Sequence, residues 1–431
     1  MSCEDNRTSL PLPEHRLRRA LLEELHLRRF PRFTAPARLL QIVMVSGEDG
    51  FAVDRAAAES LCMRFGVTPE FGKHFTCVLR EMSFVWERHT EFTSYTFIWP
   101  GSVDTLFDDD VLARLPNDWL PTLPGVVLRA RHIVILGPAD PEPPPEIIAE
   151  SFSDPNLVSC LVAQNGARMW SDIRVYPGGL GRLLIHNHTL GPGDLARLVQ
   201  QLQELGNYRN MALLGLLEAQ AAAPKLLVLE RRLAKLTEQI STTSESTNED
   251  DALLAELSAL AAELAALMTR TGYRMSATEA YAELVNDRLR VIDGQRIPGY
   301  ETLADFTERR LVPGVRTCRS FTRRLQYLSE RADWTSSLLR TRVETMMERQ
   351  SRDLLDSMNR RTGIQLRLQH TVEGLSAVAI TYYVIGLVGY IFHAAQAIKP
   401  SLNSSLLTGL AVPVVFAVVG LLLRRVTAYL H

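Results

Sequence analysis

Two long apolar stretches near the C-terminus constrain the fold of this chain more than any other feature. Residues 375–397 carry no Asp, Glu, Lys or Arg, and the same holds for residues 401–423. A helix needs about 20 apolar residues to cross a bilayer. Because only a short segment around Lys399-Pro400-Ser401 separates the stretches, the sequence predicts a transmembrane hairpin with spans at about 375–397 and 403–423.

Positive charges at the ends of these spans indicate their orientation. They are Arg360, Arg361 and Arg367 before the first span, Lys399 between the spans, and Arg424 and Arg425 after the second. Positive residues favour the cytoplasmic side of a membrane. We therefore expect a multi-pass protein of the cytoplasmic (inner) membrane, with the lipid bilayer as partner and with cytoplasmic N- and C-termini.

Length and charge narrow the classes of protein further. A chain of 431 residues suggests two or three structural units. Its 47 basic and 49 acidic residues give a net charge of −2, which argues against a nucleic-acid partner. The five cysteines are scattered without a CxxC pair, as is typical of a reducing compartment. The polar first 19 residues do not resemble a signal peptide.

Residues 16–190, which follow a tail at 1–15, alternate short apolar strands with helices. Helices are expected at 15–30 and 52–65. Strands are expected at 39–45, 75–84, 91–99, 125–136, 158–163, 168–175 and 182–185, with a turn at Pro177-Gly178-Gly179 before the last. This order predicts a cytoplasmic α+β domain.

The next part of the chain, residues 191–316, is rich in Leu and Ala and predicts a helical hairpin of coiled-coil type. Pro224 is expected to kink or break its first helix, and the second is expected to end near Thr269. The polar segment 241–251 joins the two helices.

A long stalk helix at 317–372 is expected to continue into the hairpin region at 373–431, because no proline occurs between Pro313 and Pro400. Such a helix, from Thr317 to about Phe392, would measure roughly 110 Å. Apolar residues follow it at three-and-four spacing, so this stripe packs either on the soluble domain or on copies of itself. The stripe comprises Phe321, Leu325, Leu328, Ala332, Leu339, Val343, Met346, Leu354 and Met358.

A polar residue recurs at every seventh position along the stalk and the first span. This polar stripe comprises Thr362, Gln369, Ser376, Tyr383 and Tyr390. Heptad spacing places its members on one face of a helix in a left-handed bundle. From Gln369 onward they are candidates for lining a pore between several copies, because polar residues in a span usually face a cavity or another helix. The alternative is that they hydrogen-bond neighbouring helices or lie at the membrane interface.

Glu373 and His370 lie one turn apart where the first span begins. In an oligomer Glu373 would add a ring of charge to the candidate pore. The alternative is a surface ion pair at the level of the lipid headgroups.

The segment Trp86–Phe92, which reads WERHTEF, is the densest group of polar functional side chains in the α+β domain. On one strand, Glu87, His89 and Glu91 would point to the same face and could bind a divalent cation. The alternative is a solvated strand face. His186 and His188 also share a face, but two ligands are too few for a metal site, which favours an ordinary strand end.

The sequence contains no GxxxxGK[ST], GxSxG or HExxH motif. We therefore expect no enzymatic activity, and no cofactor beyond the divalent cation considered above.

The runs WERHTEF (86–92), LLRTRVE (338–344) and RLQHTVEGLSAVAITYYVIGLVGY (367–390) resemble a bacterial family of predicted membrane-anchored proteins, domain of unknown function 3422. The resemblance extends from LPEHRLRRALLEELH at 12–26 to the end of the chain. It implies membrane anchoring and no established activity.

The order of domains is also similar to that of the CorA-like magnesium transporters, whose first spans line the pore of a homopentamer. The Gly-Met-Asn signature of those transporters is absent, because the end of the first span here reads Gly386-Leu387-Val388-Gly389-Tyr390. This resemblance implies a homo-oligomeric ion channel or transporter of CorA-like architecture. The alternative is a membrane-anchored scaffold that binds a protein partner, as yet unknown, and has no transport activity.

Overall fold

The chain divides into two compact units in the computed structural model. One comprises Met1–Thr237 and Leu257–Asp333, and the other comprises Glu238–Glu256 and Trp334–His431. The structure describes residues 12, 15–18, 21–22, 30–47, 50–68, 72–107, 109–153, 157–242, 247–398 and 403–430. Most of the helix predicted at 15–30 and the segment Lys399-Pro400-Ser401 lie outside the described residues.

A nine-stranded sheet forms the centre of the first unit, with the strand order β2-β3-β4-β1-β5-β8-β7-β6-β9. Its strands are β1 Ala37–Val45, β2 His74–Leu79, β3 Met82–Arg88, β4 Phe92–Pro100, β5 Val126–Leu136, β6 Val158–Val162, β7 Ala167–Ser171, β8 Gly181–Asn187 and β9 Gln295–Arg296. Strands β5 and β8 pair in parallel, and the other described pairs are antiparallel. The predicted α+β domain is confirmed.

Both faces of this sheet are covered, which explains the nearly continuous apolar sequence of β1. Leu39 and Val43 belong to the core under the long helix α4 (Pro192–Thr242). Leu40, Ile42 and Met44 belong to the opposite core, with helix α2 (Phe51–Arg64). Side chains of a strand alternate between faces, so one strand supplies both cores. The elements described before α4 also include the helix α3 (Pro145–Ser151) and the 3-10 helices η2 (Asp109–Arg114) and η3 (Leu120–Thr122).

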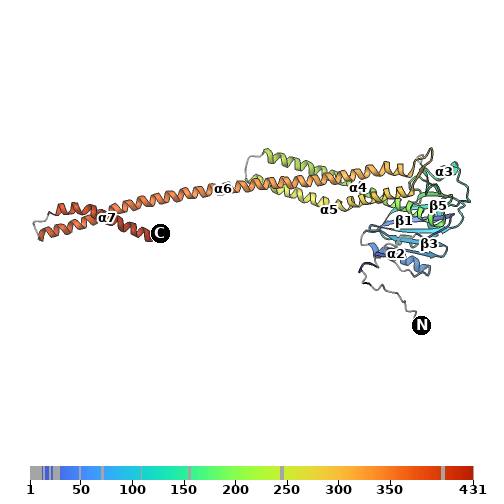
Figure 1. The fold of residues 1–431 in the computed structure, drawn as a ribbon, viewed down its shortest axis with the longest axis horizontal. Coiled ribbons are helices and arrows are strands. Elements are labelled where there is room, and N and C mark those ends of the chain that lie inside the picture. The colour runs from blue at the N-terminus through green and yellow to red at the C-terminus, as the bar shows by residue number, and fades with distance from the viewer. Residues whose placement is uncertain are drawn as a thin grey trace, which may run out of the picture. The chain divides into compact units, whose positions relative to one another are not determined.

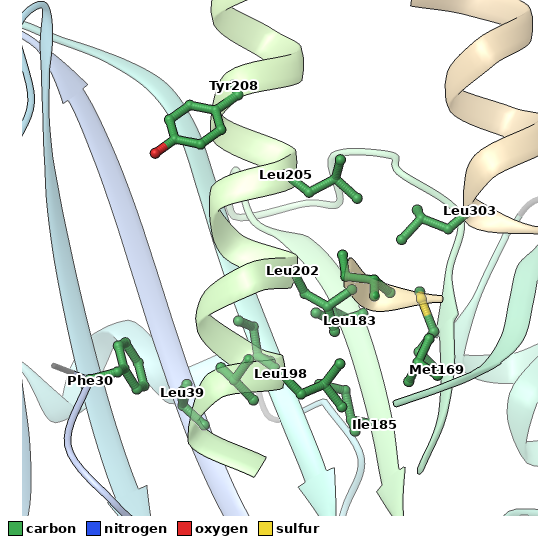
Figure 2. Packing of buried hydrophobic residues seen from close by; sticks show 14 of the residues in the cluster. Phe30, Leu39, Met169, Leu183, Ile185, Leu198, Leu202, Leu205, Tyr208 and Leu303 are labelled. Carbon is green, nitrogen blue, oxygen red and sulfur yellow. The ribbon is translucent and has the colours of Figure 1, made fainter. Parts of the chain in front are cut away.

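Helix α4 packs its first turns directly on the sheet. Figure 2 shows Leu198, Leu202 and Leu205 of α4 facing the β8 side chains Leu183 and Ile185. Leu residues at positions i, i+4 and i+7 of a helix share one face, so α4 presents a continuous apolar stripe. Figure 1 shows α4 and α2 with the sheet strands between them.

The hairpin partner of α4 is helix α5 (Thr247–Ile292), which extends well beyond the predicted end near Thr269. Buried Met275, Val285 and Ile292 explain the difference, because packing in the core keeps the last part helical. Of the two predicted effects of Pro224, a kink or a break, the break is wrong, because helix α4 continues through this residue.

Helix α6 (Leu303–Ile398) begins earlier than the stalk predicted at 317. Its first turn is capped by Thr302, whose Oγ1 accepts the Asp305 backbone N–H at 3.0 Å. Pro313 lies inside this helix, where it removes one backbone hydrogen bond. Tight packing of Gly314 against Leu213 and Leu216 of α4 accounts for the tolerance of the proline.

The second unit contains the end of α4, the start of α5, most of α6 and the last helix, α7 (Ser404–Leu430). Arg342 of α6 joins these elements, because its Nη1 donates to the Ile240 carbonyl at 3.0 Å and its Nε lies 3.1 Å from Asp250 Oδ2. The Asp250 side chain is fully buried.

Four of the described helices are long and apolar enough to cross a membrane, judged by length and composition alone. These stretches are Pro192–Thr242, Glu249–Ile292, Leu303–Ala395 and Ser404–Leu422. The sequence predicted only the last two. Membrane association is supported, and the number of spans is taken up below.

Replacement of Gly215 by Ala should destabilise the first unit. An added Cβ would lie 2.0 Å from Oγ1 and 3.0 Å from Cβ of Thr278, a fully buried residue of α5. Such overpacking costs about 1–3 kcal/mol. Gly272→Ala is the matched control, since its Cβ would meet nothing within 4 Å and should stabilise the helix by about 0.5–1 kcal/mol. Thermal unfolding of the detergent-purified full chain should move in opposite directions for the two variants.

Candidate functional site

The five residues of the polar stripe all lie on α6, and all have exposed side chains. The exposed fraction is 72% for Tyr383 and 76% for Tyr390. The stripe is therefore uncovered in a single chain.

Helix α7 folds back alongside the end of α6 (Figure 1). Ser404 Oγ lies 2.9 Å from His393 Nδ1, and a Cβ added to Gly389 would meet Thr408 at 3.7 Å. Thr381 of α6 is also buried. A helix turns by about 100° per residue, so Tyr383 lies about 200° around the axis from Thr381. The polar stripe thus lies opposite Thr381, and its member Tyr390 lies about 60° from His393, at the edge of the contact with α7.

The entrance to the apolar part of α6 holds a small polar cluster. Gln369 Nε2 donates to Glu373 Oε1 at 3.1 Å, and His370 Nδ1 lies 3.6 Å from Glu373 Oε2. Within one chain Glu373 therefore has two local partners. The predicted ring of charge concerns an oligomer and stays a prediction.

The apolar stripe of the stalk has two parts that differ in environment. Its first five members, from Phe321 to Leu339, are buried within this chain. Leu354 and Met358 are exposed by 65% and 57%. Further exposed apolar side chains follow on α6, namely Met347, Leu355, Ile364, Leu366, Leu368 and Val372. A helix with so much apolar surface in water requires a partner along this part.

Glu87, His89 and Glu91 do not lie on one strand, so that premise of the predicted cation site is wrong. Strand β3 ends at Arg88, and β4 begins at Phe92. The His89 backbone N–H donates to the Phe92 carbonyl at 2.9 Å, which makes the intervening residues a tight turn. Glu87, His89 and Glu91 therefore do not share the face of one strand.

Each of these three side chains instead meets a different neighbour. Glu91 is buried and paired with Arg274 of α5 through two contacts of 2.5 and 3.2 Å. Glu87 Oε1 lies 3.7 Å from His74 Nε2, and the His89 ring stacks on Phe92 at 4.2 Å. Their role as cation ligands stays a prediction, now without a shared face to support it.

The Glu91–Arg274 pair also affects a nearby phenol. Burial, followed by the charge of Glu91, raises the pKa of Tyr281, which keeps the hydroxyl neutral.

A buried polar network around Asp54 was not predicted from the sequence. Asp54 Oδ2 accepts hydrogen bonds from Ser46 Oγ at 2.6 Å, Thr93 Oγ1 at 2.6 Å and Arg88 Nη1 at 2.7 Å. Arg88 Nη2 also donates to the Gly47 carbonyl at 2.5 Å. The network fastens α2 to the β3–β4 hairpin, which gives Arg88 in WERHTEF a structural role.

Three arginines are buried between the sheet and α4. Arg129 Nη1 donates to Gln41 Oε1 at 2.6 Å and to Asn207 Oδ1 at 2.7 Å, and Arg131 Nη2 donates to Ser171 Oγ at 2.9 Å. Burial lowers the pKa of Arg131 to about 10 and that of Arg209 to about 9. Because water is excluded from this layer, a positively charged guanidinium is less favourable there than in solution.

One group of three metal-ligating residues occurs among the described residues: Glu142, His186 and His188. One potential ligand atom from each lies within 4.8 Å of the others. The sequence showed the two histidines on one face but gave no third ligand, because Glu142 lies far away in the chain. No sequence signal short of the strand pairing would have found it.

A family model described as "Protein of unknown function (DUF3422)" matches residues 13–430. Searches of the curated proteins and of the solved structures gave no match.

Replacement of Arg88 by Met should destabilise the α+β domain strongly. The change leaves the fully buried Asp54 carboxylate without its cation, which typically costs about 3–5 kcal/mol. Arg55→Met is the control, because Arg55 pairs with Glu59 at the surface of the same helix and should contribute less than about 1 kcal/mol.

Denaturant unfolding of the full chain in detergent measures both changes. The double variant Asp54→Leu/Arg88→Met should recover much of the loss, because it leaves no buried charge. Equal effects of Arg88→Met and Arg55→Met would contradict the assignment.

Proposed function

The chain belongs to this family of proteins of unknown function, and we propose that it is an integral inner-membrane protein whose copies associate around a path for cations. One observation carries the proposal. The polar stripe remains exposed in a single chain, and Tyr383 and Tyr390 are largely left uncovered by α7.

Two spans are proposed, at about 375–397 in α6 and 403–423 in α7. The apolar residues of α4 and α5 already have partners, since Leu226, Leu229, Leu257 and Leu260 are buried within the first unit. Glu263 lies in the interior of α5 and carries a charge, which pairs with Arg232 of α4 at 2.7 Å. Charges in the middle of a span are rare. The arginines that flank the proposed spans favour cytoplasmic termini.

Association of several copies would cover the exposed apolar surface of α6. Leu354, Leu368 and Leu375 share one heptad position. Met358 lies one turn after Leu354, and Val372 lies one turn after Leu368. This seam lies about 100° from the polar stripe. Apolar contacts between neighbouring copies would therefore place the stripe toward a common axis. A second copy of this chain is the proposed partner.

The chemistry of the stripe suits weak contact with hydrated cations. Ser376, Tyr383 and Gln369 offer neutral oxygen atoms, which solvate a cation without holding it tightly. Glu373 would add a ring of carboxylates at the cytoplasmic entrance and favour cations over anions. The missing Gly-Met-Asn signature argues against selectivity for magnesium.

The alternative is a self-associating anchor with no transport activity, in which the α+β domain binds a protein partner. The size of Tyr383 and Tyr390 favours this alternative, because tyrosine rings that point toward a narrow axis would block a path along that axis. The two functions share the same interface and differ only in ion flux.

Cysteine introduced at the stripe should cross-link neighbouring copies. In a Cys3→Ser background, Ser376→Cys in native membranes should form a disulfide-linked dimer on oxidation, because the proposed axis brings equivalent residues together. The control is Val378→Cys, which is also exposed but lies about 200° around the helix. Dimer yields are read by non-reducing electrophoresis. Equal yields at the two positions, or none at either, would argue against the interface.

Reconstituted protein should carry cations across liposome membranes. Ser376→Leu should lower the flux at least about tenfold, which corresponds to about 1.4 kcal/mol in the barrier, because an apolar ring replaces hydroxyls. Val378→Leu should leave the flux unchanged, since the residue faces away from the stripe. Cross-linking through Ser376→Cys without any flux in the wild-type protein would exclude transport and favour the anchor.

A further inference from the structure

The Glu142–His186–His188 cluster lies in the α+β domain, outside the proposed ion path. It forms at the point where two parallel strands end side by side. His186 is the residue of β8 that pairs with Leu136, the last residue of β5. The chain that leaves β5 therefore emerges beside His186, and Glu142 follows six positions later in a proline-rich loop. His188 lies two residues beyond His186, and the two imidazole rings are 4.9 Å apart.

The hydrogen bonds of both histidines leave one ring nitrogen of each available. His186 Nε2 lies 3.1 Å from the Asp140 carbonyl oxygen, and His188 Nδ1 lies 3.4 Å from the Asn165 carbonyl oxygen. A carbonyl only accepts, so these nitrogens carry the hydrogens in the neutral rings. The remaining atoms, Nδ1 of His186 and Nε2 of His188, then present lone pairs. Metal-bound histidines commonly show this arrangement, with the second nitrogen donating to a backbone carbonyl.

The available nitrogen of His186 is also an unsatisfied buried atom. His186 is 6% exposed, and its Nδ1 has no hydrogen-bond partner among the described residues. A buried polar atom without a partner costs about 1–3 kcal/mol. A bound cation would remove that cost.

The carboxylate of the cluster is held in place by a cation from the neighbouring strand. Arg168 Nη1 of β7 donates to Glu142 Oε1, and the guanidinium of Arg168 lies over the rings of Trp170 at 4.5 Å and Tyr300 at 5.3 Å. This pair positions the Glu142 side chain and leaves Oε2 as its second oxygen. The same Arg168 charge would oppose a cation, so its removal provides a test.

We propose that Glu142, His186 and His188 form a binding site for a divalent transition-metal ion of the Zn²⁺ class. Two imidazoles and one carboxylate suit such ions, whereas Mg²⁺ prefers oxygen ligands. Three protein ligands also leave an open coordination position. Binding would tie the proline-rich loop after β5 to the end of β8.

The test uses the full chain in detergent, without a polyhistidine tag and after treatment with a chelator. Isothermal titration calorimetry with Zn²⁺ should show one binding site for each chain. Binding of Co²⁺ should give the visible absorption bands of a complex with a low coordination number. His188→Ala and Glu142→Gln should each weaken Zn²⁺ binding by at least about tenfold. Both side chains are at least partly exposed, so the variants should fold.

Matched controls lie outside the cluster. His15→Ala and Glu146→Gln change exposed residues of the same types and should leave the affinity unchanged. Arg168→Met should strengthen binding several-fold, because it removes the competing positive charge. The proposal is overturned if no stoichiometric Zn²⁺ binding occurs, or if His188→Ala and Glu142→Gln bind Zn²⁺ as the wild-type protein does. Neither result bears on the proposed ion path, which involves only α6.

Discussion

The packing of α4 across one face of the sheet is the interaction on which the first unit depends. Leu198, Leu202 and Leu205 cover the inner residues of β8, and the helix then continues to meet α5. The close approach requires glycine at two points. A Cβ at Gly206 would lie 2.4 Å from Arg129 Nη2, and one at Gly215 would lie 2.0 Å from Thr278 Oγ1. Glycine is unfavourable inside helices. Here the burial of apolar surface on both sides of α4 offsets that cost.

The same packing explains why so many polar groups are buried in this domain. Helix α4 crosses strands that carry Gln41, Arg129 and Arg131 among their apolar residues. Buried polar groups are tolerated when they are hydrogen-bonded, and Arg129 finds Gln41 and Asn207 at 2.6 and 2.7 Å. Arg129 Nη2 remains without a partner among the described residues. The layer is therefore held in one register by polar contacts as well as by apolar burial, because a shifted helix would leave further donors unsatisfied.

Local patterns in the sequence predicted the elements whose stability is local. The apolar run of β1 and the turn at Pro177-Gly178-Gly179 depend on neighbouring residues, and both appear as expected. Pro224 and Pro313 do not interrupt their helices, because packing between helices outweighs the one backbone hydrogen bond that each proline removes. The turn at His89–Glu91 was missed for the opposite reason. Its residues have no Gly or Pro to mark it, and the bidentate pair with distant Arg274 holds Glu91 there. The position of Glu142 follows only from the parallel pairing of β5 with β8, which no local pattern encodes.

The two apolar stretches at the C-terminus differ in what a single chain leaves uncovered. In α6, Gly389 and His393 lie against α7, while Ser376, Tyr383 and Tyr390 remain exposed. Hydroxyl groups exposed to hydrocarbon lose the hydrogen bonds that water would give them, although serine can bond to its own helix backbone. Tyrosine cannot do so, and away from the headgroup region it needs a partner or water. Tyr383 lies eight residues after Leu375, about 12 Å into the proposed span, which is deeper than the interface. An association of copies around this face would satisfy its hydroxyl, and α7, which bears no comparable stripe, would then face the lipid.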